Sequence, residues 1–310
     1  MNYIKIYADF LNKKLNPQKK LKVIFDCSNG TAGLVLKQLT TNDKQLTTHF
    51  INDKIDGNFP SHGPNPSAIG ALEQLQKTVL KEKADLGAIF DADGDRVFFI
   101  DNLGRFIDPD TITRLLIWHF NPKKVVIDVR TGWLVKRLIT KDLKLTTSKA
   151  GHYFIKKLMQ EFNADFGAEK SGHYYFPIKN GKNISYIDSG IITAIEVINA
   201  ISKLPYSLAD FNDLLPQYCR SGEINIKMNN ESGIRNYESL LKKIENKFKN
   251  QAVKVSYLDG LTIESAPPTG GWWFNLRPSN TEPVLRLNIE AKKKEIVDNL
   301  IKKIYSIFSL

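Results

Sequence analysis

Three carboxylates alternate with small residues in the segment DADGDR, at positions Asp91, Asp93 and Asp95. The apolar run LGAIF precedes this segment and VFFI follows it, which predicts a tight loop between two buried strands. Charges this close repel one another unless a cation neutralises them, and all-oxygen ligand sets favour a hard cation. We therefore expect a Mg²⁺ site whose coordination shell is completed by a phosphate oxygen, with Arg96 placed to steer that phosphate.

Two other interpretations of this acidic loop are weaker. A calcium-binding EF-hand loop also begins with alternating aspartates, but its glycine is sixth and its glutamate twelfth, whereas here Gly94 is fourth and Asn102 twelfth. The flanking elements are also expected to be strands, not helices. A solvated acidic turn is the plainer alternative, but its charges would be costly beside two apolar strands without a partner.

A second candidate loop, GAEKSGH, occupies residues 167–173. Glu169, Ser171 and His173 place a carboxylate, a hydroxyl and an imidazole at alternate positions, a set able to hydrogen-bond adjacent hydroxyls of a sugar. Taken alone, a plain polar turn is the more common explanation of such a segment. Upstream, Lys149 and His152 open a helical pattern, so a cation and a ring donor stand near a helix N-terminus, which attracts anions.

A third loop, RPSNTEP, collects groups suited to a phosphate. Guanidinium, hydroxyl, amide and backbone N–H donors are packed closely there, and its two prolines restrict the main chain. A capped turn is an equally open explanation of the loop taken alone. The candidate phosphate ligands are Arg277, Ser279, Asn280, Thr281 and Arg286.

The elements that position these loops follow an α/β order. Strand, glycine loop and helix patterns alternate through residues 1–106 and again through 107–217, which predicts two doubly wound α/β/α domains with loops at the carboxyl ends of their strands. After a hinge near residues 216–221 the order changes to a strand EINIKM, a polar helix over 235–250, three strands and a C-terminal helix. Residues 218–310 are therefore expected to form a smaller α+β domain.

Composition narrows the class of protein. No apolar run approaches the roughly 20 residues of a membrane span, and the N-terminus lacks the pattern of a signal peptide, so we expect a cytoplasmic protein with no membrane partner. Two cysteines are too few for a disulfide framework. The net charge of +11 is compatible with nucleic acid, but the chain lacks a basic stripe interleaved with aromatic residues, and no nucleic-acid partner is expected.

Taken in order, the segments DGNFPSHGPNP, DADGDR, SKAGHYFIKK, GAEKSGHYYF and RPSNTEPVLR resemble the signature loops of the alpha-D-phosphohexomutases, of the phosphomannomutase/phosphoglucomutase type. The resemblance runs from about residue 21 to the C-terminus, and the ordered combination is far more specific than any single loop. It implies three of the four domains of such an enzyme, which moves a phosphoryl group between the C1 and C6 oxygens of a hexose through a bisphosphorylated intermediate.

The resemblance also implies roles for the candidate residues. Asp91, Asp93 and Asp95 would bind Mg²⁺, and Arg96, Lys149 and His152 would lie at the catalytic centre. Sugar hydroxyls and the non-reacting phosphate of a hexose phosphate, such as mannose or glucose 1- or 6-phosphate, would be held by Glu169, Ser171, His173, Arg277, Ser279, Asn280, Thr281 and Arg286.

One departure from the family pattern is large. The phosphorylated serine of the family stands in a Thr-Ala-Ser-His-Asn-Pro type loop of the first domain, and this sequence contains no such loop. Ser61 and His62 mimic it superficially, but they belong to the DGNFPSHGPNP segment. We therefore expect one of three cases: a truncated mutase, a mutase whose phosphoserine domain is a separate chain and thus a partner, or a protein that has lost the mutase reaction. The alternative is a non-catalytic sugar-phosphate-binding or regulatory protein of the same fold.

Overall fold

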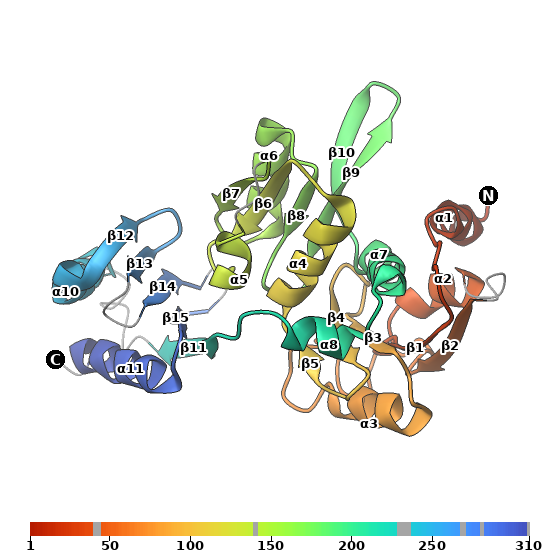
Figure 1. The fold of residues 1–310 in the computed structure, drawn as a ribbon, viewed down its shortest axis with the longest axis horizontal. Coiled ribbons are helices and arrows are strands. Elements are labelled where there is room, and N and C mark those ends of the chain that lie inside the picture. The colour runs from red at the N-terminus through yellow and green to blue at the C-terminus, as the bar shows by residue number, and fades with distance from the viewer. Residues whose placement is uncertain (40–44, 139–141, 228–236, 267–270, 280–281, 309–310) are drawn as a thin grey trace. The chain divides into compact units, whose positions relative to one another are not determined.

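The computed structural model describes residues 1–39, 45–138, 142–227, 237–266, 271–279 and 282–308 (Figure 1). The chain divides into two compact units. Unit 1 comprises Met1–Ile127, Arg137–Thr146 and Gly151–Leu215, and unit 2 comprises Asp128–Lys136, Thr147–Ala150 and Pro216–Leu310. None of the helices in the described ranges combines the length and apolar character needed to cross a bilayer.

The first sheet belongs to unit 1 and has the strand order β2-β1-β3-β4-β5. β1 pairs in parallel with β2 and β3, whereas β4 and β5 join antiparallel. β3 and β4 are buried at every residue, which explains their uninterrupted apolar sequences. The elements are α1 (Tyr3–Asn12), β1 (Leu21–Asp26), α2 (Ala32–Leu39), β2 (Leu46–Ile51), α3 (Glu73–Glu82), β3 (Leu86–Phe90), β4 (Val97–Asp101) and β5 (Phe106–Ile107).

The second sheet has the order β10-β9-β8-β6-β7. β6 and β8 are parallel, and β9 and β10 extend the sheet antiparallel as a hairpin (Figure 1). Its strands are β6 (Lys124–Asp128), β7 (Lys144–Ser148), β8 (Phe166–Ala168), β9 (Tyr174–Asn180) and β10 (Asn183–Asp188), and the helices around it are α4 (Pro109–Phe120), α6 (His152–Phe162), α7 (Gly190–Lys203) and α8 (Leu208–Asp213).

Helices pack on both faces of the second sheet. α6 packs Ile155 and Met159 against Tyr175 of β9, whereas the neighbouring Tyr174 stacks on Phe166 and donates its hydroxyl to the backbone carbonyl of Pro109. The two tyrosines therefore serve opposite faces, as adjacent strand residues must. α7 is buried at all of its residues except Lys203, because it contacts both α4 and β4 of the first sheet.

Unit 2 contains a wholly antiparallel sheet of order β11-β15-β14-β13-β12. Its core contains Phe248, Trp272 and Phe274, whose rings contact one another. The elements are β11 (Cys219–Lys227), α10 (Tyr237–Phe248), the 3₁₀ turn η1 (Lys249–Gln251), β12 (Ala252–Ser256), β13 (Leu261–Ser265), β14 (Trp272–Pro278), β15 (Val284–Ala291) and α11 (Lys294–Phe308).

Two details of this sheet differ from the sequence prediction. β11 begins at Cys219 and not at Glu223, because a β-bulge between Arg220 and Glu223 lets the strand continue through Gly222. β12 is the additional strand: within the described ranges, β12 to β15 lie between α10 and α11, where three strands were expected. This edge strand exposes both of its valines and therefore lacks the apolar face that sequence patterns detect.

The short helix α5 (Trp133–Lys136) belongs to unit 2 and is tied to its sheet by Trp133. The backbone N–H of Trp133 donates to Glu290 Oε1 at 2.7 Å, and its indole N–H donates to Glu264 Oε1 at 2.7 Å. Glu290 is fully buried and also accepts from the Trp273 indole and from Arg220 Nε. The buried carboxylate thus has donors on both of its oxygens, as a charge removed from water requires.

The loop between β3 and β4 is held by backbone contacts from two other elements of unit 1. Thr31 N–H donates to the Ala92 carbonyl, and Gly190 N–H at the start of α7 donates to the Gly94 carbonyl, each at 2.9 Å. A Cβ on Gly30 would lie 2.3 Å from the Ala92 oxygen, and a Cβ on Gly190 would lie 2.6 Å from the Arg96 oxygen. Only glycine permits these approaches.

Residues 52–67 form a polar loop that is fastened to the end of β1 by a buried pair. His62 Nε2 lies 3.2 Å from both oxygens of Asp26, and the two side chains are 7% and 0% exposed. The hydrogen bond that His62 donates to the Asp26 carboxylate raises the pKa of the His62 imidazole. Ser61 adds hydrogen bonds to Asn29 and Asn52, so the loop has defined contacts despite its Gly- and Pro-rich sequence.

Substitution of Gly190 by alanine is expected to destabilise unit 1 by about 1–3 kcal/mol, because the added methyl overlaps the Arg96 carbonyl, even though alanine favours helices. Hydrogen-exchange protection of β3 and α7 amides measures the change. Gly57→Ala is the matched control, since nothing lies within 4 Å of its added Cβ. Equal protection in the two variants would contradict the close approach.

The His62–Asp26 pair is expected to make stability depend on pH. Because the folded-state pKa of His62 is raised above that of the unfolded chain, about 6.5, the pair contributes fully below that pH and is lost as pH rises through the folded pKa. Between pH 6 and pH 8.5, the free energy of unfolding measured with urea should fall more for the wild type than for His62→Gln. An equal fall in the free energy of unfolding of the wild type and of His62→Gln would count against the ion pair.

Candidate active site

The acidic loop brings its three aspartates together. One carboxylate oxygen from each of Asp91, Asp93 and Asp95 lies within 4.8 Å of the others. Asp91 is buried and accepts hydrogen bonds from the backbone N–H groups of Gly94 and Arg96 and from Arg96 Nε, the last at 2.6 Å. Asp93 is exposed and Asp95 half-buried, so the cluster opens to solvent on one side.

The electrostatics of the cluster suit a hard dication. Burial, together with the neighbouring Asp95, raises the pKa of Asp91 to about 6, while a hydrogen bond from His173 lowers the pKa of Asp95. The raised pKa of Asp91 reports the cost of gathering carboxylates in a buried loop, which a cation would relieve. A donor set of carboxylate oxygens alone fits Mg²⁺, with room for further oxygen ligands on the open side.

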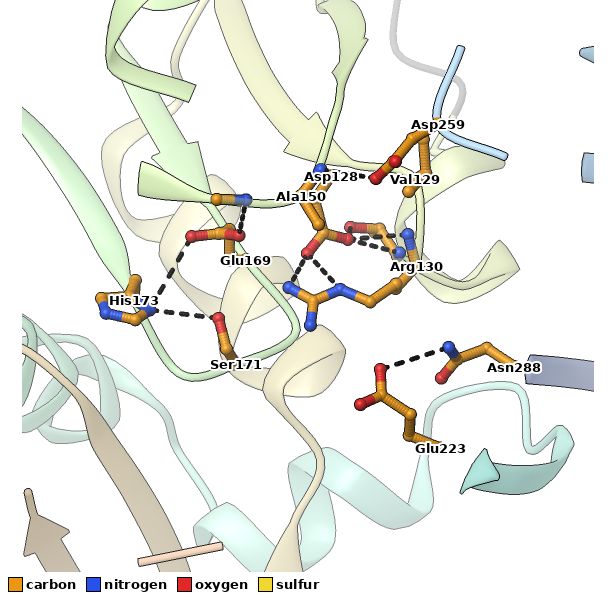
Figure 2. Close-up of polar contacts among 12 residues, drawn as sticks. Asp128, Val129, Arg130, Ala150, Glu169, Ser171, His173, Glu223, Asp259 and Asn288 are labelled. Atoms are coloured by element: carbon orange, nitrogen blue, oxygen red, sulfur yellow. Dashed lines mark hydrogen bonds and ion pairs between the residues drawn. The ribbon is translucent and has the colours of Figure 1, made fainter. Parts of the chain in front are cut away.

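The predicted sugar loop docks directly onto the acidic loop within unit 1. Val97 N–H donates to the Gly172 carbonyl at 3.1 Å, and Arg96 and His173 form an isolated antiparallel bridge. The His173 Nε2 atom lies 3.4 Å from Asp95 Oδ2. Figure 2 shows Ser171 Oγ beside His173 Nδ1, at 3.1 Å. The structure therefore joins two of the loops that the sequence predicts to be functional.

Two residues of the sugar loop make contacts that the sequence did not predict. Glu169 is only 3% exposed, and its Oε1 accepts the Gly151 N–H at 2.8 Å (Figure 2). Lys170 forms ion pairs with Asp108 and, at 3.4 Å, with Asp110, at the start of α4. Lys170 therefore ties the sugar loop to the start of α4.

Lys149 and His152 fall on opposite sides of the division between the units. His152 is the first residue of α6 in unit 1, where it is exposed, and Gly151 is the N-cap with a φ of 121°. Lys149 is an exposed residue of unit 2. The adjacent Ala150 N–H donates to Asp259 Oδ2 at 3.0 Å, which fixes the end of this segment to the turn before β13 (Figure 2).

The predicted phosphate loop of unit 2 presents two arginines from paired strands. Arg277 of β14 lies opposite Arg286 of β15, and both contact Glu223, at 3.2 and 3.3 Å. Arg277 is 4% exposed, and burial, followed by the positive charge of Arg130, lowers its pKa. Ser279 accepts the Glu282 N–H, whereas Asn280 and Thr281 lie outside the described residues.

Arg130 is a candidate that sequence reasoning missed. It follows β6 and pairs with Asp128 through Nε and Nη2, at 2.9 and 2.5 Å (Figure 2). Its charge acts on Arg277 within unit 2, so the two guanidiniums provide positive potential that suits an anion. The sequence signal that could have identified Arg130 is its position just after the carboxyl end of a strand, because ligands bind at such ends in α/β sheets.

Sequence comparison assigns all three parts of the chain to one family. Residues 2–104, 108–218 and 223–307 match, respectively, alpha/beta/alpha domain II, alpha/beta/alpha domain III and the C-terminal domain of the phosphoglucomutase/phosphomannomutase family. Named relatives agree. The chain is 35% identical to a phosphomannomutase of Methanocaldococcus jannaschii and 33% identical to one of Vibrio cholerae, over 98% of its length in each case. It spans 66% and 68% of those relatives.

Solved structures show the same fold. A phosphoglucomutase/phosphomannomutase family protein of Burkholderia thailandensis superposes with a TM-score of 0.80 at 25% identity, covering 98% of this chain and 63% of the other. An N-acetylphosphoglucosamine mutase of Aspergillus fumigatus, in complex with GlcNAc-6P and magnesium, matches at 0.65 and 14% identity, over 99% of this chain and 69% of the other, and supports the fold alone. The chain therefore belongs to the phosphoglucomutase/phosphomannomutase family, with the sequence and fold of its domains II, III and IV.

Proposed function

We propose that this chain forms the metal-, sugar- and phosphate-binding part of a cytoplasmic phosphohexomutase that interconverts hexose 1-phosphate and hexose 6-phosphate. The observation that carries the proposal is the docking of the sugar loop on the acidic loop, through Val97 with Gly172 and Asp95 with His173. A carboxylate cluster beside polar groups suited to hydroxyls is what phosphoryl transfer to a sugar requires.

We assign Asp91, Asp93 and Asp95 to a Mg²⁺ ion, which when bound would offset the charge of the transferring phosphoryl group. Arg96 is fixed by Asp91 through Nε and contacts Asn65 Oδ1 through Nη1 at 3.5 Å, and the other N–H groups of its five-donor guanidinium would orient the phosphoryl oxygens. Its role is to hold the transferring group beside the acidic loop. Glycine contacts from residues 30 and 190 keep that loop in place.

The substrate would be held at its hydroxyls by Glu169, Ser171 and His173, with Lys149 and His152 serving proton transfer and charge stabilisation near the reacting oxygen. Each hydroxyl-binding group accepts or donates in a different direction, which suits neighbouring sugar hydroxyls. The hexose phosphate is the proposed ligand because the named relatives are phosphomannomutases and solved neighbours carry GlcNAc-6P or glucose 1,6-bisphosphate.

The non-reacting phosphate would be bound in unit 2 by Arg277, Ser279, Asn280, Thr281 and Arg286, with Arg130 adding positive potential. A mutase must bind the phosphate at C1 in one half-reaction and at C6 in the other, so long and adaptable donors suit this loop. We place the domain boundaries near residues 106 and 217, at the changes in element order.

The phosphoryl donor would be a phosphoserine in a further domain, on this or another chain, because the sequence has no Thr-Ala-Ser-His-Asn-Pro type loop. The serine gives its phosphoryl group to the free hydroxyl oxygen of the hexose monophosphate, and the proton of that hydroxyl passes to the serine oxygen as the serine O–P bond breaks. The bisphosphate then returns its other phosphoryl group to the serine oxygen, and the serine proton passes to the hexose oxygen that is released, which leaves the hexose with its phosphate moved and the donor restored.

The mutase proposal is tested by ³¹P NMR of the chain with Mg²⁺, mannose 1-phosphate and a trace of mannose 1,6-bisphosphate, with and without the separately expressed first domain of a relative. We expect a 6-phosphate signal in the mixture. Arg277→Ala should reduce its rate at least tenfold, since a charged hydrogen bond to phosphate is lost, whereas the exposed-charge control Lys302→Ala should not.

Two results would count against the proposal in different ways. Binding of mannose phosphate without turnover in either tube would favour a non-catalytic sugar-phosphate-binding or regulatory protein of this fold. No binding at all would reject the hexose phosphate as ligand.

Asp93→Asn is expected to weaken Mg²⁺ binding at least tenfold, because one of three carboxylate ligands is lost. Isothermal titration of the chain with MgCl₂ measures it. The exposed position of Asp93 keeps folding intact, and Asp9→Asn on α1 removes the same charge from an exposed site outside the acidic loop as the control. Equal Mg²⁺ affinity in both variants would place the metal elsewhere.

A further inference from the structure

The Glu169 carboxylate is anchored from within the protein. Its Oε1 accepts the Gly151 N–H at 2.8 Å, and its Oε2 accepts the Tyr175 hydroxyl at 2.5 Å. His173 Nδ1 lies 3.7 Å from the same Oε2. A carboxylate accepts hydrogen bonds at both oxygens, so these contacts fix the orientation of the group.

Tyr175 is held so firmly that its hydroxyl is a fixed point. The side chain is fully buried against Val126, Ile155 and Met159 in the core between β9 and α6. On its other side the Lys156 ammonium lies 6.0 Å from the ring centroid and pairs at 2.7 Å with Asp188, the residue opposite Tyr175 in the β9–β10 ladder. Packing and a cation–π contact together restrict both side-chain torsions.

Glu169 also serves the start of α6. Gly151, the N-cap of that helix, has a φ of 121° that favours glycine, and it offers no side chain to cap the helix. The Glu169 carboxylate satisfies its N–H and places a negative charge at the helix N-terminus, where the helix dipole favours it. Because His152 directly follows Gly151 in the chain, a change in the orientation of the Glu169 carboxylate would also affect the position of His152.

We propose that Tyr175 is a positioning residue of the hexose site. Its hydroxyl, acting with the Gly151 N–H, fixes the orientation of the Glu169 carboxylate, the group proposed above to meet sugar hydroxyls, and it links the sugar loop to the first turn of α6. The sugar-binding half of this inference rests on the proposed function. The anchoring half rests on unit 1 alone.

The experiment compares Tyr175→Phe with Tyr174→Phe in the full chain. Both changes remove one hydroxyl from a fully buried tyrosine, but the Tyr174 hydroxyl donates to the Pro109 carbonyl and not to the sugar loop. In Tyr175→Phe we expect the Gly151 amide to exchange about tenfold faster by ¹⁵N NMR, because Glu169 loses its second anchor. Tyr174→Phe should leave that amide unchanged.

Ligand binding supplies the second readout. Tyr175→Phe should raise the Kd for mannose 6-phosphate about tenfold and leave the Kd for inorganic phosphate unchanged, because phosphate does not need Glu169. Tyr174→Phe, whose lost hydroxyl contacts the Pro109 carbonyl, should change neither value. A double-mutant cycle with Glu169→Gln should show that the Tyr175 effect disappears once the carboxylate is gone.

Each failure has its own signature. Unchanged Gly151 exchange in Tyr175→Phe would overturn the anchoring role, whatever the ligand. Faster exchange with an unchanged Kd for mannose 6-phosphate would overturn the positioning role. If the wild-type chain itself does not bind mannose 6-phosphate, the proposed function fails, while Gly151 exchange still decides whether Tyr175 holds Glu169.

Discussion

Electrostatic repulsion among Asp91, Asp93 and Asp95 is the constraint on which the rest of unit 1 depends. Three carboxylates within 4.8 Å of one another, beside two strands that are buried throughout, require a loop that cannot spread apart. Most of the contacts that hold the loop together are made by backbone groups. Backbone N–H groups hold Asp91 from within the loop, while Thr31 and Gly190 hold its carbonyls from outside. The result is a loop whose backbone is held by main-chain contacts, to which Arg96 and His173 add side-chain contacts with Asp91 and Asp95.

The same backbone contacts make the metal and sugar loops a single piece of structure. Gly172 receives the N–H of the first residue of β4, and His173 lies against Asp95, so the residues proposed to face the phosphoryl group and those proposed to face the sugar share one scaffold. Lys170 fastens that scaffold to α4. Catalytic groups must be held within about 0.5 Å of their productive geometry, and the contacts between the two loops limit their movement relative to each other within unit 1.

The sequence predicted well those features that depend on local pattern. The apolar runs of β3 and β4, the acidic loop and the α/β order are confirmed, because burial and turn chemistry leave periodic traces. It could not show which distant residue meets which. The burial of Glu169, the partners of Lys170 and the electrostatic influence of Arg130 on Arg277 depend on tertiary proximity. β12 escaped detection because an exposed edge strand lacks an apolar face, and the roles of the site residues stay predictions.

The Trp133 anchor has a consequence for how such a protein can be divided. Glu290 lies in the C-terminal sheet, yet one of its donors, the Trp133 N–H, comes from a segment more than 150 positions earlier, inside the region matched to domain III. A cut at the boundary between the matched domains would separate the buried Glu290 carboxylate from the Trp133 N–H. It would also expose the Glu264 oxygen that accepts the Trp133 indole N–H. Recombination or gene fission at that boundary would leave Glu290 with only Trp273 and Arg220 as donors, unless the Trp133 segment travelled with the C-terminal sheet.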